Sequence, residues 1–118
     1  MDTESDIGDF MKVSLDDVKR ARERIKNIIK VTDTERSMSA SKVFGCDFYF
    51  KYENTQFTGS FKLRGAMNKI LTLTEGEKKK GVVTCSAGNH AQGVAFSATQ
   101  AGVKSTIVMP INAPLIKV

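Results

Sequence analysis

The residues best suited to chemistry lie in two short segments, and the first is centred on a lysine. Residues 54–65 read NTQFTGSFKLRG and join the end of an expected strand to the start of an expected helix. Open α/β sheets bind their ligands at such junctions. Lys62 falls at the third position of that helix, next to the positive end of the helix dipole and near Arg64, so its amine should be harder to protonate. A Schiff-base lysine needs this property.

The second segment has the composition of an anion site. Residues 86–93 read SAGNHAQG and again follow an expected strand. Gly88 permits an unusual backbone angle, and the free N–H groups of the next helix start form a cradle for an anion such as a carboxylate. Asn89 and His90 add side-chain hydrogen bonds. On composition alone, however, a lysine at a helix start is more often a solvated charge, and a Gly-Asn pair is more often a simple turn.

The elements that must position these segments alternate between helix and strand. We expect helices over 14–30, in a short segment ending near Gly45, from Ser60 onward, from Thr74 to Gly81 and over 91–101. Strands are expected over 46–52, 82–85 and 105–109, with a loop at 31–37. Strands separated by crossover helices imply a parallel sheet flanked by helices on both faces. The fold class is therefore α/β, with residues 1–13 as a flexible leader and 14–118 as one domain.

Apolar side chains at three- and four-residue steps define the buried face of two of these helices. In the helix over 14–30 they are Leu15, Val18, Ala21, Ile25, Ile28 and Ile29, and in the helix from Ser60 they are Leu63, Ala66, Met67, Ile70 and Leu71. Ser14 with Asp17 and Thr74 with Glu77 should cap two helices, and Ser60 a third. Gly65 inside a helix should mark a close packing contact.

Composition narrows the function classes. The 118 residues are 41% apolar and 26% charged, which is typical of one globular domain. The net charge of +5 is spread over helix faces without a nucleic-acid motif, so nucleic acid is not an expected partner. No run is long enough to span a membrane, and we expect a cytoplasmic protein. Cys46 and Cys85 fit no metal or redox spacing and are expected to be buried reduced thiols, and no metal site is expected.

The two chemical segments together resemble a known enzyme family. SFKLRG at 60–65 and SAGNHAQG at 86–93 are similar to the two N-terminal motifs of the fold-type II pyridoxal-phosphate (PLP) enzymes, which include threonine dehydratase, serine racemase, cysteine synthase and the tryptophan synthase β subunit. The similarity is closest to threonine dehydratases and runs from about Ser14 to the last residue. It includes ENTQ at 53–56 and VVTCS at 82–86. The chain thus resembles the N-terminal part of such a catalytic domain.

The resemblance implies a role for individual residues. Lys62 would bind the PLP aldehyde as the catalytic lysine, Phe61 would pack against the cofactor ring, and Asn89 would hydrogen-bond the phenolic oxygen of PLP. The substrate carboxylate would be held by Ser86, Ala87, Gly88, Asn89 and His90. In the nucleotide-activated branch of the family, positions matching Thr58, Gly59 and Gln92 lie in an effector pocket between subunits. The alternative is that Thr58 and Gly59 form an ordinary turn and that Gln92 is an ordinary residue on a helix surface.

The activity implied by this resemblance is deamination of L-threonine to 2-oxobutanoate, and of L-serine to pyruvate, with release of ammonia. Lys62 would remove the α-proton while the cofactor ring takes up the negative charge. Such reactions serve isoleucine synthesis or threonine catabolism, and a homo-oligomer is expected. Serine racemases resemble this loop but carry a serine where this chain has Ala87, which cannot transfer a proton. Elimination without efficient racemisation is therefore expected.

Three alternatives remain open. A hydrolase could use Ser86 or Cys85 with His90, but a nucleophile elbow would need glycine at position 84, which is Thr84, and no acidic orienting residue is near. The His90 side chain is instead expected to be satisfied locally at the helix start. A nucleotide-binding module would need G-x-G-x-x-G or G-x-x-x-x-G-K-[ST], and neither occurs. The third alternative is an inactive truncated product or a fragment, because the family's phosphate-binding loop and its residue facing the pyridine nitrogen lie beyond Val118.

Overall fold

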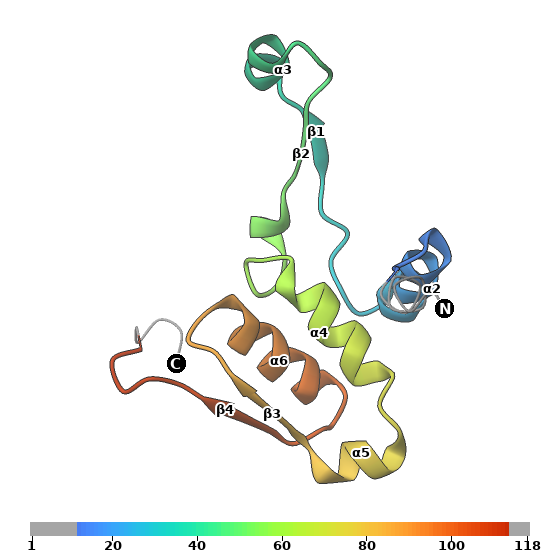
Figure 1. Cartoon of the computed structure of the whole chain (residues 1–118), viewed down its shortest axis with the longest axis vertical. Helices are drawn as coiled ribbons and strands as arrows, with labels where there is room; N and C mark the ends of the chain where they lie inside the picture. The colour runs from blue at the N-terminus through green and yellow to red at the C-terminus, as the bar shows by residue number, and fades with distance from the viewer. Residues whose placement is uncertain (1–11, 114–118) are drawn as a thin grey trace, which may run out of the picture.

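The computed structural model describes residues 12–113, which divide into a body and a projecting arm (Figure 1). In chain order the elements are α2 (Leu15–Ile25), β1 (Thr34–Arg36), α3 (Met38–Phe44), β2 (Tyr49–Lys51), the 3-10 turn η1 (Glu53–Thr55), α4 (Lys62–Leu71), α5 (Glu75–Lys80), β3 (Val82–Cys85), α6 (Asn89–Gln100) and β4 (Ser105–Val108). We call residues 34–51 the arm, and α4, α5, β3, α6 and β4 the body. The radius of gyration of 17.9 Å exceeds the about 13 Å of a compact domain of 100 residues, because the arm extends outward.

The body confirms the expected α/β class. Strands β3 and β4 pair in parallel, with Val82 opposite Ser105 and Cys85 opposite Val108. Helix α6 crosses between them and lies between the strands and α4 (Figure 1). The core formed there contains Ala66, Ile70, Val94, Ala98 and Val103, with Val82 and Ile107 packed against it from the strands. The expected helix and strand periods place these side chains on facing surfaces.

The other face of the two strands corrects one expectation. Burial alternates along both strands, so that Val83 and Val108 point away from α6 and are 75% and 51% exposed. Within residues 12–113 the strands are thus covered by helices on one face, whereas we expected cover on both. The same alternation explains why Cys85 is exposed. Cys46 follows α3 and is exposed too, so the expectation of two buried thiols was wrong.

Helix boundaries follow the capping residues closely. Ser14 with Asp17 and Thr74 with Glu77 both form complete capping boxes, as expected. Gly45 ends α3 with a φ of 64°, a left-handed conformation that glycine adopts without strain. These local signals therefore acted as the sequence indicated.

Helix α2 is shorter than expected, since it ends at Ile25 rather than near Lys30. The side-chain amide of the buried Gln56 donates to the carbonyl of Lys30 (2.9 Å) and accepts from its N–H (3.0 Å), which holds the chain there in a non-helical path. Of the expected apolar face, Ile25 alone is fully buried, whereas Leu15 and Val18 are 68% and 55% exposed. The helix therefore contacts the body mainly through its last turn, where Arg24 also donates to Asn68 of α4.

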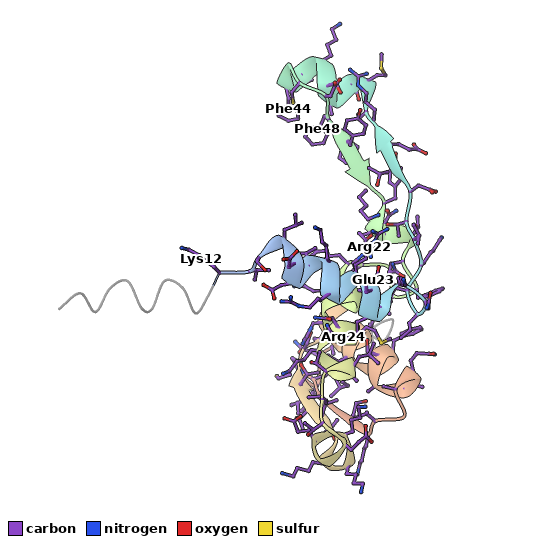
Figure 2. All side chains as sticks on the ribbon, turned by 90° about the vertical axis from the view of Figure 1, so that its right-hand side faces the viewer. Lys12, Arg22, Glu23, Arg24, Phe44 and Phe48 are labelled. Carbon is purple, nitrogen blue, oxygen red and sulfur yellow. The ribbon has the colours of Figure 1, made fainter. Side chains whose placement is uncertain are left out.

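The arm is a β-ribbon that the sequence did not predict. Strand β1 lies where we expected a loop, and it pairs antiparallel with β2, with Thr34 opposite Lys51 and Arg36 opposite Tyr49. The strand expected over 46–52 is therefore shorter and belongs to this ribbon, outside the parallel sheet. Helix α3 closes the far end, where Phe44 and Phe48 lie side by side (Figure 2) with ring centroids 5.3 Å apart.

Two further expectations concern other parts of the chain. The flexible leader expected over 1–13 lies outside the described residues except for Lys12 and Val13, which precede α2 without regular structure. None of the helices within residues 12–113 is long and apolar enough to cross a membrane.

Candidate active site

Helix α4 begins at the candidate lysine. Lys62 is its first residue, not its third, because the chain reaches the helix through a turn in which Gly59 has a φ of 67° and donates its N–H to the carbonyl of Gln56 (2.8 Å). Ser60 is buried, and its hydroxyl accepts the N–H of Lys62 at 3.3 Å, although Phe61 occupies the formal cap position. The lysine side chain is exposed, with Nζ 5.0 Å from the centre of the Phe61 ring.

Arg64, which we expected near the lysine amine, is paired with a carboxylate. Its guanidinium forms a two-pronged ion pair with Glu53, in which Nε and Nη2 lie 2.8 and 2.7 Å from the two carboxylate oxygens. The hydrogen bonds from Arg64, together with one from the Thr32 hydroxyl, lower the pKa of Glu53 below its ordinary value of 4.5. The positive charge of Arg64 is thus balanced by a neighbouring carboxylate.

The second segment leads from β3 into α6. The helix begins at Asn89, with Gly88 as its cap residue at φ −139° and ψ −147°, outside the positive-φ region. Gly88 has no side chain that could cap this helix start, and backbone N–H groups of the first turn are directed out of the helix. The Ser86 hydroxyl accepts the N–H of Gly88 at 3.2 Å and keeps its own proton as a donor. Donors of this kind can bind a carboxylate.

The surroundings of the His90 side chain differ from what we expected. We expected its side chain to be satisfied locally at the helix start, but the imidazole is exposed and hydrogen-bonds no residue within 12–113. Asn89 is exposed as well, and Ala87 and Gly88 are half-buried. The loop therefore presents its polar side chains outward.

The two segments meet through a glycine. A Cβ built on Gly93 would lie 3.2 Å from the carbonyl carbon and oxygen of Lys62 and 3.3 Å from the nitrogen of Leu63. Only a residue without a side chain lets α6 approach the start of α4 so closely. Phe57 and Phe96 add a stacked contact, with ring centroids 5.7 Å apart. Figure 1 shows that α4 and α6 run in the same direction, so both N-terminal ends lie at the same end of the body.

The sequence pointed to the wrong glycine for this contact. We expected Gly65 to mark a close approach, but nothing lies within 4 Å of a Cβ built there. Gly93 was part of the second motif without a role of its own. The clue that could have found it is its place among small residues on the buried face of α6, with Ala91, Val94 and Ala98.

The candidate effector residues occupy the turn and the helix. Gly59 forms the turn before α4, and Gln92 is half-buried in α6. The hydroxyl oxygen of Thr58 is buried and has no hydrogen-bond partner within residues 12–113. A buried hydroxyl without a partner is uncommon and marks the turn as incompletely satisfied.

Comparison with known proteins identifies the family. A family model described as "Pyridoxal-phosphate dependent enzyme" matches residues 25–118. The chain is 52% identical over 106 residues to the L-threonine ammonia-lyase of Thermotoga maritima, and the match covers 90% of this chain and 26% of that protein. It is 47% identical over 108 residues to the catabolic L-threonine dehydratase of Escherichia coli K12, covering 92% of this chain and 33% of that protein. The chain thus spans about a quarter to a third of these relatives.

A solved structure agrees with this result. Maize serine racemase superposes with a TM-score of 0.82 at 40% sequence identity, over 89% of this chain and 32% of the racemase. The matched region includes both chemical segments, since the family model begins at residue 25 and continues to residue 118. These matches leave the hydrolase and nucleotide-module alternatives without support, and the chain belongs to the pyridoxal-phosphate dependent enzyme family.

Proposed function

We propose that this chain supplies the lysine and the carboxylate loop of a PLP-dependent ammonia-lyase that converts L-threonine, and L-serine, to a 2-oxo acid and ammonia. The contact between Gly93 and the Lys62 backbone is the observation that carries the proposal, because it fixes the amine-bearing helix against the anion-binding helix. The names of the relatives in Thermotoga maritima and Escherichia coli support the reaction class.

The residues present fit part of a PLP site. Lys62 offers an exposed primary amine without a carboxylate partner within the described residues, and the uncapped start of α6 offers backbone donors for an anion. When bound, PLP supplies an aldehyde for that amine and a ring that accepts the electron pair of the substrate α-carbon. Phe61, 59% exposed beside Lys62, has a free face for an aromatic ring.

The residues of the chain have separate tasks in this proposal. Lys62 would hold the cofactor through Nζ and would take the α-proton of the substrate at the same atom. The Ser86 hydroxyl and the first-turn N–H groups of α6 hold the substrate carboxylate, with Ala87, Gly88 and His90 forming the rest of the loop. Asn89 would donate to the phenolic oxygen of PLP.

Racemisation is the second candidate activity, because of the similarity to maize serine racemase. The side chain of Ala87 has no group that can carry a proton, so a second base on the opposite face of the substrate is missing from this loop. We therefore propose elimination as the main reaction. An Ala87→Ser variant should gain racemisation, measured by chiral chromatography of serine, and no gain would contradict this one-residue explanation.

Three parts of the proposal rest mainly on family resemblance. A nucleotide effector would contact Thr58, Gly59 and Gln92, and the partnerless hydroxyl of Thr58 supports this assignment. Cytoplasmic location and assembly as a homo-oligomer are also proposed. Equilibrium dialysis with AMP tests the first part, cell fractionation the second and light scattering the third. Absence of nucleotide binding, a membrane-bound or secreted product, or a monomer would each overturn its part.

The decisive experiment is trapping of the cofactor on the chain. PLP is added to the 118-residue protein, borohydride reduces the adduct to a stable secondary amine, and peptide mass spectrometry locates it. We expect absorbance near the visible edge and labelling of Lys62. Lys62→Ala should abolish the specific label, whereas Lys69→Ala, on the exposed surface of the same helix, should keep it. Labelling spread evenly over the surface lysines would contradict the proposal.

The reaction itself is tested by product formation. With threonine and PLP, release of 2-oxobutanoate that depends on Lys62 would support the lyase assignment. A chain that binds PLP at Lys62 and releases no 2-oxo acid from threonine or serine would overturn the assigned reaction while leaving the cofactor site in place.

A further inference from the structure

A half-buried ion pair ties the start of α4 to a distant part of the chain. Glu53 and Arg64 face each other from either side of the lysine turn, with side chains 16% and 30% exposed. The same carboxylate accepts the hydroxyl of Thr32 at 2.6 Å, and Lys51 donates to the carbonyl of Thr32 at 2.9 Å. Thr32 is buried, so three segments far apart in sequence meet at one carboxylate.

A second tie lies on the other side of the lysine turn. The buried side chain of Gln56 bonds both backbone groups of Lys30, and its oxygen also accepts the N–H of Phe57 at 3.2 Å. Residues 57–61 therefore run between two fixed points, Gln56 before the turn and Arg64 after Lys62. Both points are anchored to the same extended segment, residues 30–32.

The two ties and Gly93 hold Lys62 from different sides. Gly93 of α6 contacts the Lys62 backbone, while Arg64, two residues later, is held by Glu53. Lys62 lies in the first turn of its helix, where no earlier helical turn supports the backbone. Without the ion pair, that turn would be held mainly by α6, and the root of the lysine side chain would be free to shift.

We propose that the Glu53–Arg64 ion pair is a positioning device for Lys62, which sets the direction of its amine toward the cofactor aldehyde. This inference rests on the proposed function. Neither residue is assigned contact with the cofactor, so both are positioning residues. The geometry requires arginine at 64, because only a planar guanidinium can bond both carboxylate oxygens in this way. A reacting group displaced by about 1 Å can lose about a hundredfold in rate.

The test follows the rate at which the Lys62 amine condenses with PLP, a step that releases one water. Glu53→Gln and Arg64→Lys should slow adduct formation by about tenfold to a hundredfold and lower the fraction of Lys62 trapped by borohydride. The matched control is Asp47→Asn, which removes the negative charge of a different ion pair, between Asp47 and Arg36 at 2.7 Å in the arm. It should leave the rate unchanged. All rates are measured well below each variant's own unfolding midpoint, so that lost stability alone does not alter them.

Each outcome decides the inference. Slower trapping in folded Glu53→Gln with an unchanged control supports it, and a wild-type rate in that variant overturns it. If Glu53→Gln does not fold, Arg64→Lys decides in the same way. Thr32→Val, which removes one hydrogen bond to Glu53 and keeps the side-chain shape, is the least disruptive of these substitutions. A wild-type chain that forms no adduct at Lys62 contradicts the proposed function instead, and removes the basis of this inference.

Discussion

The arm and the body contain similar proportions of apolar residues but bury them to very different extents. In the arm, Met38, Val43 and Phe44 are 75%, 77% and 65% exposed, and two strands of three residues pair only with each other. In the body, Leu63 and Met67 of α4 are completely buried. A two-stranded ribbon is only marginally stable alone, whereas helices that share a core fix one another.

This difference explains where the candidate chemistry lies. All proposed cofactor and substrate residues are on the body or on the turn that enters it, between residues 57 and 93. A reacting group must be held within a fraction of an ångström, and rigid packed elements achieve this better than an exposed ribbon. The arm carries none of these residues, and its exposed aromatic side chains contribute to neither proposed site.

The largest effect on stability should come from creating a cavity in the core of the body. Met67→Ala removes a fully buried side chain and should lower the free energy of unfolding by about 2–5 kcal/mol. Phe44→Ala at the exposed end of the arm should cost about 1 kcal/mol or less. Urea unfolding followed by circular dichroism measures both. Equal losses would show that the arm is as tightly packed as the body, and the comparison would fail.

An intermediate effect is expected from two glycines in the body. Gly93→Ala would press a methyl group against the Lys62 carbonyl and should cost about 1–3 kcal/mol of stability. Gly65→Ala faces open space in a helix and should add about 0.5–1 kcal/mol. Thermal unfolding of both variants shows whether each substitution lowers or raises the stability. A neutral Gly93→Ala would mean that α6 can move away from α4 at little cost, contrary to the rigid contact inferred here.

The smallest effect concerns the first turn of α2, on the periphery. Hydrogen bonds from the Ser14 hydroxyl and N–H, and then from Arg20, lower the pKa of Asp17 to about 2 from 3.8. Because the folded pKa is the lower one, the cap stabilises the helix above pH 3.8 and loses this contribution as the pH falls toward 2.

Removing the hydroxyl should weaken that shift. In Ser14→Ala, the carboxyl of Asp17 should titrate closer to 3.8, as measured by its carbon chemical shift in NMR. Glu77, whose pKa is lowered by the backbone and hydroxyl of Thr74 in the other capping box, should titrate unchanged and is the internal control. An unchanged Asp17 would show that Arg20 and the backbone N–H suffice.

Features set by neighbouring residues were predictable, and features set by distant residues were not. The capping boxes, the left-handed glycine after α3 and the strands at 82–85 and 105–108 all depend on a few consecutive side chains. The ribbon was missed because β1, with the sequence TER, has no apolar pattern, and because the alternation over 46–52 indicates a strand without indicating which segment it pairs with. Exposure of Cys46 and Cys85 was missed because burial depends on what covers a surface.

For this protein the sequence alone determined the α/β class and the two segments whose residue types could do chemistry, centred on Lys62 and on Gly88 to His90. Local periodicity and motif composition are enough for both, because neither depends on distant contacts. Only the tertiary structure decided that Gly93 rather than Gly65 is the point of closest approach, and that Arg64 pairs with Glu53. The physical reason is that both facts are distances between elements, which depend on how the helices pack.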